Sequence, residues 1–175
     1  APVENFFEGL DDAPEFKEWA RDATEIFVVG PTLTFISSYQ TSFLMEKAQS
    51  GCEIKLLVMK GSDNPAIHLM DEYSVLFPPQ MQLYLDVAHQ TLEECRNNAR
   101  ANGWNMEVKI YPLIPLSLTI IDGSKNHGKM LVTSIPYKVE GRSRPCFELT
   151  RISQPDLFHL FYDRYLEMWK AAEDL

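Results

Sequence analysis

The sequence predicts one α/β domain over residues 1–175, with a mixed β-sheet and helices on both of its faces. Three observations support this fold class. Compact β-prone runs alternate with helical patterns in the first part of the chain, which is typical of strand–helix–strand units. Several β-prone runs then follow in succession, and one long amphipathic helix ends the chain. With 175 residues, the chain is long enough to bury one substantial hydrophobic core.

The first half of the chain predicts two buried strands joined by a helix. Apolar residues recur at helical spacing from Pro14 to Thr24, and the compact apolar run Glu25 to Gly30 indicates a buried strand. A second helical pattern starts at Ile36 and is closed by Gly51, and Glu53 to Lys60 is the second strand. Because such units make right-handed crossovers, we expect these two strands to be parallel.

The middle of the chain predicts a loop, a long helix and a third strand. Gly61 to Pro78 is rich in Gly, Asp, Asn and Pro, with a short helical turn near Ile67 to Tyr73. Apolar side chains recur at helical spacing from Pro79 to Ala101, and Gly103 ends this helix. Asn105 to Tyr111 alternates apolar and polar residues, as a half-buried strand does.

A central hairpin follows the third strand. Ser117 to Ile121 and Lys129 to Ile135 are both β-prone runs. Asp122 and Gly123 come directly after the first run, and this pair favours the positive φ angles of a tight turn.

The chain ends with a strand and the most clearly patterned helix. A polar loop, Tyr137 to Pro145, precedes the expected last strand, Cys146 to Ile152. The helix begins with a capping-box-like pair, Ser153 and Asp156, and its wide, aromatic apolar stripe continues to Ala172.

Composition and charge limit the classes of partner that we expect for this protein. The formal net charge is −9 at pH 7, and phosphate binding relies on positive charge, so the composition disfavours nucleic acid as a partner. No apolar run approaches the roughly 18 residues of a membrane span, and no signal peptide is visible, so we expect a cytoplasmic protein and no membrane partner. The chain begins at Ala1 without a methionine, so we expect it to be part of a longer protein.

The cysteine and histidine positions predict no metal site. Cys52, Cys95 and Cys146 are odd in number and widely spaced, which indicates reduced thiols rather than disulfides or metal ligands. The histidines are scattered and match no metal-binding motif. We therefore expect neither a metal nor a cofactor.

The stretch from Pro115 to Gly123 resembles the signature of the phospholipase D superfamily, H-x-K-x-x-x-x-D-G. Asp122 and Gly123 stand at the family's Asp-Gly positions, whereas Pro115 and Ser117 stand at its His and Lys positions. The frame of the motif is therefore kept, and both of its reactive side chains are replaced.

The resemblance extends beyond this stretch. Ala23 to Gly30 and Ala48 to Leu57 are similar to the two strand-forming steps that open the family's fold, and the likeness covers roughly residues 13–136. The tail, with Arg144-Pro145 and the helix after Asp156, resembles bacterial regulatory domains of this family that lack a working motif. The resemblance implies one phospholipase D-like half.

The implied function is a non-catalytic module for ligand sensing or dimerisation. In active members, two His supply the nucleophile and the proton, and two Lys hold the phosphate oxygens across a two-fold axis. Pro115 offers no nucleophile and Ser117 no charge, so we expect no enzymatic activity. The family's two-fold assembly implies a homodimer.

Two alternatives stay open. His127-Gly128-Lys129 is itself an H-x-K, which would support a phosphodiesterase or nuclease acting as a homodimer, although Ser134 stands where that motif needs Asp. The aromatic last helix would instead suit a protein-interaction domain.

The candidate ligand site is a cluster of charged residues around the hairpin and the last strand. Guanidinium groups clamp phosphate or carboxylate groups bidentately. If the hairpin and the last strand are neighbours, we expect a small anionic, phosphate-containing ligand near Asp122 and the loop Tyr137 to Pro145. The residues expected to bind it are Asp122, His127, Lys129, Arg142, Arg144 and Arg151.

Overall fold

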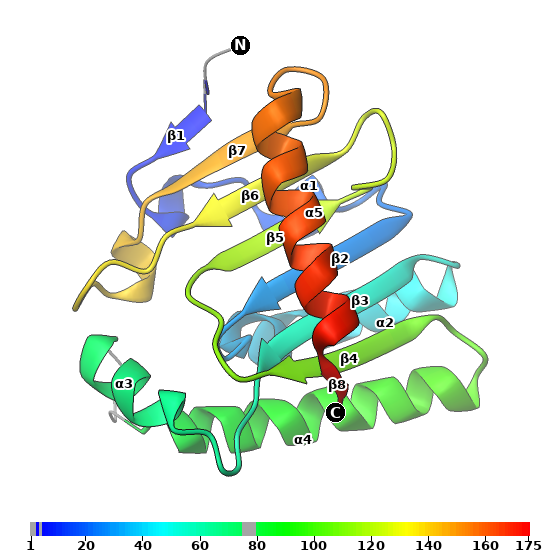
Figure 1. Ribbon diagram of the computed structural model, residues 1–175. Helices are drawn as coiled ribbons and strands as arrows, with labels where there is room; N and C mark the ends of the chain where they lie inside the picture. The colour runs from blue at the N-terminus through cyan, green and yellow to red at the C-terminus, as the bar shows by residue number, and fades with distance from the viewer. Residues whose placement is uncertain (1–2, 4, 75–79) are drawn as a thin grey trace.

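In the part of the chain that the computed structural model describes, residues 3, 5–74 and 80–175, eight strands form one mixed sheet (Figure 1). Their order across the sheet is β1-β7-β6-β5-β2-β3-β4-β8. The strands are β1 (Asn5–Phe7), β2 (Glu25–Gly30), β3 (Glu53–Met59), β4 (Met106–Tyr111), β5 (Ser117–Ile121), β6 (Lys129–Thr133), β7 (Cys146–Thr150) and β8 (Glu173–Asp174).

The helices connect these strands and close the chain. The α-helices are α1 (Phe16–Trp19), α2 (Thr41–Gln49), α3 (Ala66–Tyr73), α4 (Met81–Ala101) and α5 (Pro155–Ala171). Three short helical segments of other types are η1 (Leu10–Asp12), η2 (Ile36–Gln40) and η3 (Gly141–Ser143). Within the described residues, no helix is both long and apolar enough to cross a membrane.

The direction of the strands gives the sheet two distinct edges. β2, β3 and β4 run parallel, as expected for the first two, with Glu25 beside Glu53 and Ile54 beside Met106. We call the edge where these three strands begin the amino edge and the edge where they end the carboxyl edge. β5 is antiparallel to β2, so its last residue, Ile121, lies at the amino edge and Ser117 lies at the carboxyl edge.

Helices cover both faces of the sheet, which confirms the predicted α/β class (Figure 1). α5 crosses one face, and α2 and α4 lie behind the other. Phe158 of α5 is fully buried, and Trp169 makes an edge-to-face contact with Phe27 of β2, with ring centroids 5.6 Å apart. Much of the aromatic stripe of the last helix therefore packs on the sheet.

Some elements differ in length from the prediction. The first helix stops at Trp19 rather than Thr24, because the chain turns through the buried Ala20 and Ala23 to enter β2. β6 ends at Thr133 and β7 at Thr150, each two residues earlier than predicted. The helical turn predicted near residues 67–73 is the full helix α3. The predicted start of the long helix at residue 79 lies outside the described residues.

The edge strands β1 and β8 were not predicted, because two or three residues carry no usable periodicity. Their pairing with β7 and β4 makes them strands. Near β1, η1 packs against η3, which lies in the loop between β6 and β7. A Cβ atom at Gly9 would collide with the backbone carbonyl of Arg142, so this contact requires glycine.

We expect Gly128→Ala to lower the free energy of unfolding by about 1–3 kcal/mol. A Cβ atom there would lie 2.7 Å from the carbonyl oxygen of Asp122 and 3.0 Å from that of Lys125, and backbone atoms cannot move aside cheaply. Gly141→Ala is the matched control, because a Cβ atom at Gly141 meets nothing within 4 Å. Urea unfolding of both variants measures the difference, and equal stabilities would contradict the packing seen around Gly128.

Candidate functional site

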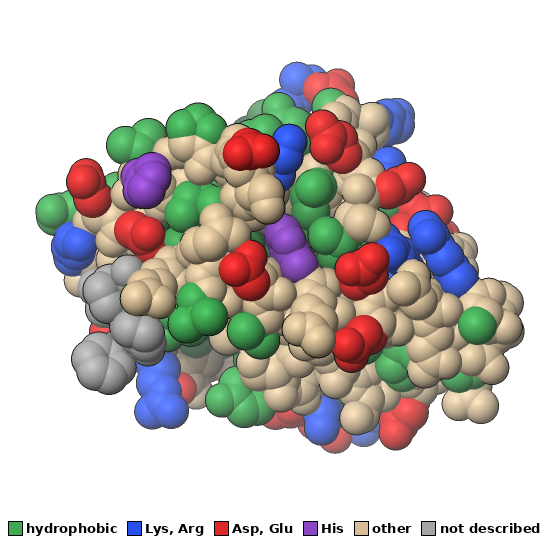
Figure 2. Space-filling model, turned by 90° about the horizontal axis from the view of Figure 1, so that it is seen from below, with side chains coloured by type: hydrophobic (Ala, Val, Ile, Leu, Met, Phe, Trp, Pro, Cys, Tyr) green, Lys and Arg blue, Asp and Glu red, His purple; other side chains and the backbone are tan. Residues whose placement is uncertain are grey.

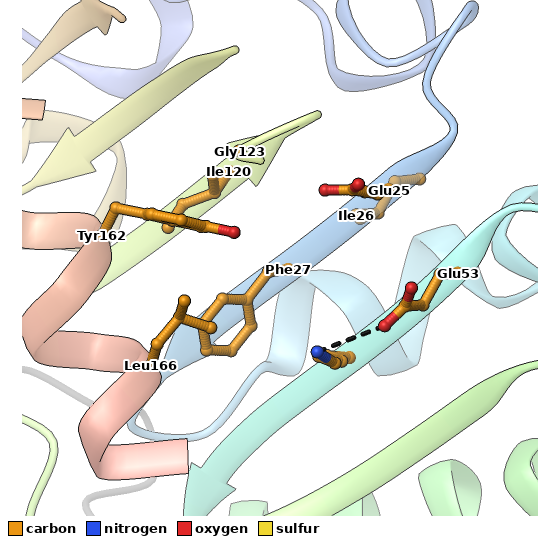
Figure 3. A pocket seen from close by; sticks show the side chains of 9 residues that line it. Glu25, Ile26, Phe27, Glu53, Ile120, Gly123, Tyr162 and Leu166 are labelled. Atoms are coloured by element: carbon orange, nitrogen blue, oxygen red, sulfur yellow. Dashed lines mark ion pairs between the residues drawn. The ribbon is translucent and has the colours of Figure 1, made fainter. Parts of the chain in front are cut away.

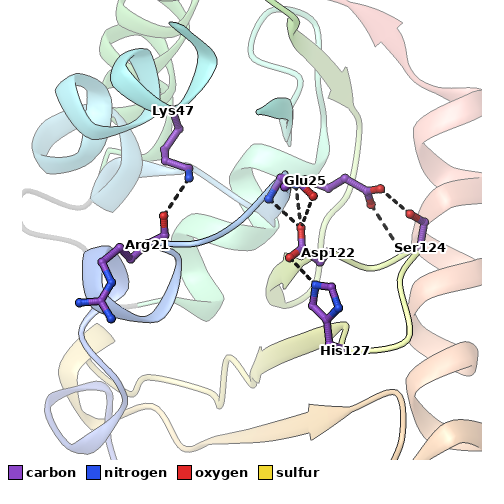
Figure 4. A network of polar contacts seen from close by, with 7 residues as sticks. Arg21, Glu25, Lys47, Asp122, Ser124 and His127 are labelled. Carbon is purple, nitrogen blue, oxygen red and sulfur yellow. Dashed lines mark hydrogen bonds and ion pairs between the residues drawn. The ribbon is translucent and has the colours of Figure 1, made fainter. Parts of the chain in front are cut away.

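The carboxylate of Asp122 joins the end of β5 to the start of β2 at the amino edge (Figure 4). Its Oδ1 accepts hydrogen bonds from the Thr24 N–H at 2.8 Å, the Thr24 hydroxyl at 2.9 Å and the Glu25 N–H at 2.9 Å. Asp122 is only 3% exposed. In the same figure, Ser124 donates hydrogen bonds to the carboxylate of Glu25. Since a buried carboxylate needs such donors, this network fixes the amino edge locally.

The other carboxylate oxygen of Asp122 holds an exposed imidazole. Nε2 of His127 lies 2.9 Å from Oδ2 of Asp122, and since an ionised carboxylate only accepts, Nε2 is the donor. The His127 side chain is 69% exposed. The amino edge therefore carries an exposed imidazole, His127, whose orientation is set by its hydrogen bond to the buried carboxylate of Asp122.

The environment of Asp122 favours its charged form. Burial raises the pKa of Asp122, but the hydrogen bonds from Thr24, Glu25 and His127 together outweigh burial, so the pKa lies below its ordinary value. The backbone of Asp122 has φ 51°, which is uncommon for a residue other than glycine. Of the predicted Asp122-Gly123 pair, Asp122 takes the positive φ angle and Gly123 does not, and a loop rather than a tight turn connects β5 to β6.

Arg151 secures the same loop from the side of α5. Its Nε donates to the carbonyl oxygen of Gly123 at 3.1 Å. Its guanidinium carbon lies 5.6 Å from the ring centre of Phe158 and 5.8 Å from that of Tyr162. These contacts give Arg151 a structural role in holding the loop against α5.

Lys129 is also engaged within the fold. Its ammonium lies 4.7 Å from the ring centre of Trp19, a cation–π distance. At the same edge, Nζ of Lys47 donates to the carbonyl oxygen of Arg21 at 2.8 Å (Figure 4). The cations of the amino edge thus also serve to hold neighbouring segments together.

The structure does not bring the six predicted ligand-binding residues together. β6 and β7 are antiparallel, so Lys129 pairs with Thr150 at the amino edge, whereas Thr133 pairs with Cys146 at the carboxyl edge. The residues at the amino edge are Asp122, His127, Lys129 and Arg151, and those at the carboxyl edge, before β7, are Arg142 and Arg144.

The expected single anion site near Asp122 and the loop 137–145 is therefore wrong. A five-residue strand spans roughly 13 Å, which separates the two groups of side chains. Nε of Arg144 donates to the carbonyl oxygen of Val139 at 3.3 Å, and burial lowers the pKa of this guanidinium. Arg142 is exposed. Both arginines lie in the loop before the last strand, as predicted, but this loop is at the edge opposite Asp122.

A small cavity lies between α5 and the sheet near the amino edge (Figure 3). Its volume is ≈ 30 Å³, room for about two water molecules. Glu53 pairs with Lys55 at 3.2 Å inside it, and burial followed by the charge of Glu25 raises the pKa of the nearby Tyr162. The cavity is too small for a metabolite. Its lining residues are Glu25, Ile26, Phe27, Glu53, Lys55, Ile120, Gly123, Tyr162 and Leu166.

A larger pocket opens at the carboxyl edge, between α3 and the loops on either side of the hairpin. Its volume is ≈ 550 Å³. The rings of Tyr73 and Tyr137 meet there with centroids 5.6 Å apart and planes at 65°. We call it the tyrosine pocket. Its lining residues are Leu69, Met70, Glu72, Tyr73, Pro115 and Tyr137.

The pairing of the hairpin strands brings two walls of the tyrosine pocket to one edge. Ser117 pairs with Thr133, so Pro115 before β5 and Tyr137 after β6 both lie at the carboxyl edge. Pro115 was singled out in the sequence, but Tyr73 and Tyr137 were not. The signal for Tyr73 was the helical spacing of residues 67–73, and Tyr137 stood only at the border of a polar loop.

The described residues contain no group of three or more His, Cys, Asp or Glu side chains able to hold a metal ion. Cys52, Cys95 and Cys146 are free thiols. Burial, first among several causes, raises the pKa of Cys52 to about 11, so its thiol is protonated and unreactive at neutral pH.

The structure defines an α/β domain, and comparisons with known proteins bear on this fold. No protein-family model and no curated protein matches the chain. The chain is similar to the solved structure of TrmBL2, an archaeal chromatin protein that shows a novel mode of DNA binding, with a TM-score of 0.59 and 15% sequence identity. The likeness covers 100% of this chain and 56% of that chain.

These comparisons overturn the resemblance to the phospholipase D superfamily and to its bacterial regulatory domains. No family model supports it, and the protein found to share the fold is an archaeal chromatin protein. Local contacts explain why Asp and Gly stand at positions 122 and 123. Asp122 accepts hydrogen bonds from the residues that begin β2, and Tyr162 leaves no room for a Cβ atom at Gly123. Hydrogen bonding and packing at the end of β5 therefore account for both residues of the pair.

The expectation that nucleic acid is disfavoured as a partner is corrected as well. It rested on the net charge of −9, and a protein with this fold is described as binding DNA. Net charge is a property of the whole surface, so it does not exclude one edge or one face from binding phosphates.

We expect Asp122→Ala to lower the free energy of unfolding at pH 7 by about 2–4 kcal/mol, because three donors of Thr24 and Glu25 lose a buried, charged acceptor. Asp122→Asn keeps an acceptor oxygen and should lose about 1–2 kcal/mol. Urea unfolding at pH 7 measures both losses, and an Asp122→Ala variant as stable as the wild type would contradict the network.

Acid should remove the contribution of the Asp122 charge. Its pKa is lower in the folded than in the unfolded chain, so the contribution is complete above the unfolded pKa and is lost as pH falls through the folded pKa. The stability difference between wild type and Asp122→Asn should therefore shrink between pH 5 and the most acidic pH at which the protein stays folded. A difference that is constant over this range would show that the charge contributes nothing.

Proposed function

We propose that this chain is a small-molecule-binding domain whose ligand occupies the tyrosine pocket. The observation that carries the proposal is the pocket itself, ≈ 550 Å³ in volume and lined by three separate segments of the chain. Ligand sites in proteins are typically about 300–1,000 Å³ and mostly apolar, with a few polar groups that orient the ligand. The proposal keeps the ligand-sensing role expected from the sequence and moves it to the carboxyl edge.

The lining also changes the expected chemistry of the ligand. Leu69, Met70 and Pro115 supply apolar surface, the two tyrosines supply ring faces, and Glu72 supplies a carboxylate. The described lining residues include no Lys or Arg, and phosphate groups are bound mainly by such cations or by helix N-termini. The pocket therefore supports an uncharged or positively charged ligand better than the phosphate ester expected from the sequence.

We expect Leu69→Arg to block the pocket without unfolding the protein, because Leu69 is 68% exposed and arginine would extend across the opening. Val87→Arg on α4 is the matched control, since Val87 is also an exposed apolar residue on a helix, at 55%. A thermal-shift screen of neutral, cationic and anionic metabolites identifies compounds that raise the Tm of the wild type. Their effect should be lost in Leu69→Arg and kept in Val87→Arg. Equal responses of the two variants would place binding elsewhere.

Nucleic-acid binding is a second candidate, favoured by the likeness of fold to a DNA-binding chromatin protein. The amino edge carries Lys125, His127 and Lys129 close together in the chain, and Lys125 and His127 are exposed. Opposing this candidate, acidic and hydrophobic side chains dominate the middle of the face that carries α4, and Lys and Arg lie mainly toward its margins (Figure 2). Any DNA contact is therefore expected at the amino edge.

If this candidate holds, affinity for a labelled DNA duplex should fall steeply with salt, because bound phosphates release counterions. Lys125→Glu should weaken binding to all sequences and reduce the salt slope by about 1. Arg142→Glu, at the carboxyl edge, is the control of equal charge change and should bind more tightly than Lys125→Glu. Fluorescence anisotropy at 50 and 200 mM salt gives both quantities. Equal losses in the two variants would indicate a response to net charge alone.

The remaining expectations from the sequence stay predictions. Neither of the two pockets described above is lined by His127 or Lys129, so the phosphodiesterase alternative rests on the Asp122-held imidazole alone. Homodimerisation, a protein-interaction role and a cytoplasmic location likewise stay predictions. Hydrolysis of bis-p-nitrophenyl phosphate that disappears in His127→Ala would favour the enzyme over the binding domain.

A further inference from the structure

The two tyrosine rings of the pocket present their faces in a fixed arrangement. Tyr73 is 41% exposed and Tyr137 is 67% exposed, and their planes meet at 65°. The backbone N–H of Lys138 donates to the carbonyl oxygen of Tyr73 at 3.0 Å. This bond ties the residue that follows one ring to the backbone of the other, so the backbone segments that carry the two rings are held side by side.

A cation of the protein already uses one of these rings. Nζ of Lys138 lies 5.7 Å from the ring centre of Tyr137, within the distance at which a ring face attracts an ammonium group. The backbone of Lys138 has φ 56°, a conformation that is uncommon for a non-glycine residue. Among the described residues, no carboxylate lies within 4.0 Å of this ammonium. The ring face is thus the only partner these contacts give to the Lys138 ammonium in the described part of the chain.

The net charge of the protein favours a cation over an anion. Glu72 is the charged side chain among the described lining residues, the Lys138 ammonium lies over the Tyr137 ring, and the chain as a whole has a net charge of −9. Such a field concentrates cations and repels anions. The ring quadrupoles add an attraction that an uncharged molecule of the same shape does not receive.

Resting on the proposed small-molecule function, we infer that the tyrosine pocket takes an organic cation, an amine or quaternary ammonium group carried on an apolar body. The ring faces of Tyr73 and Tyr137 and the carboxylate of Glu72 recognise its charge, and Leu69, Met70 and Pro115 contact its apolar part. The Lys138 ammonium competes with the ligand for the face of Tyr137.

The test compares two probes that differ only in charge. Choline carries a trimethylammonium group, and 3,3-dimethylbutan-1-ol replaces its nitrogen by carbon. Titration calorimetry or ligand-observed NMR on the full chain should show choline binding at least about fivefold more tightly than the alcohol. Tyr137→Phe keeps a ring face and should retain the preference. Tyr137→Leu keeps apolar volume without a ring face and should reduce the preference to less than about twofold.

Variants of Lys138 test the competition directly. Lys138→Gln frees the face of Tyr137 and should raise choline affinity about threefold. Lys125→Gln removes the same charge at the opposite edge of the sheet and controls for net charge; it should leave choline affinity within about twofold of the wild type. Glu72→Gln should weaken choline and leave the alcohol unchanged.

The outcomes separate the inference from the function on which it rests. Equal affinities for choline and the alcohol, or tighter binding of the alcohol, overturn the cation inference and leave the small-molecule domain standing. Binding of neither probe, together with a metabolite screen whose active compounds are all uncharged or anionic, also overturns only the inference. Failure of both probes and of every metabolite in the screen overturns both.

Discussion

The hydrogen bonds to Asp122 are the constraint on which the centre of the sheet depends. β2 and β5 are neighbours in space but lie almost a hundred residues apart in the chain, and the carboxylate of Asp122 accepts both the N–H and the hydroxyl of Thr24. This contact sets the register of the antiparallel pair at the point where the parallel and antiparallel halves of the sheet meet. The Asp122 network lies at the amino edge, and the tyrosine pocket lies at the carboxyl edge.

Sequence patterns predicted the central elements because those elements are repetitive. The compact runs of β2 and β3 and the long stripe of α4 have clear periodicity, and the α/β class follows from their order. Sequence patterns did not predict features that depend on which strands pair or on how far apart two residues lie in space. β8 is a strand only because β4 lies beside it. Arg144 lies just before β7, as predicted, but two successive antiparallel pairings put this end of β7 at the edge opposite Asp122. The Asp122-Gly123 pair was recognised as important, but for a chemical motif rather than for the hydrogen bonds that require it.

The tyrosine pocket shows why the candidate site was harder to predict than the fold. Its walls come from α3, from the residue before the β5 strand and from the loop after β6, and no spacing in the sequence connects these three segments. Charge was no guide to this pocket either, since the arginines near the last strand lie outside its described lining, which is mainly apolar and aromatic. A site assembled from single residues on separate segments becomes visible only once the topology is known.

The contact between η3 and η1 gives the pocket a mechanical connection to the start of the chain. Tyr137 lies in the same loop as η3, and the backbone of Arg142 in η3 leaves room only for glycine at position 9. η1 in turn follows β1 closely, and β1 is held by β7, the strand that this loop enters. Tyr137 and the border strand β1 are therefore linked through one tightly packed loop at the carboxyl edge, so a change in the position of this loop would reach the first strand.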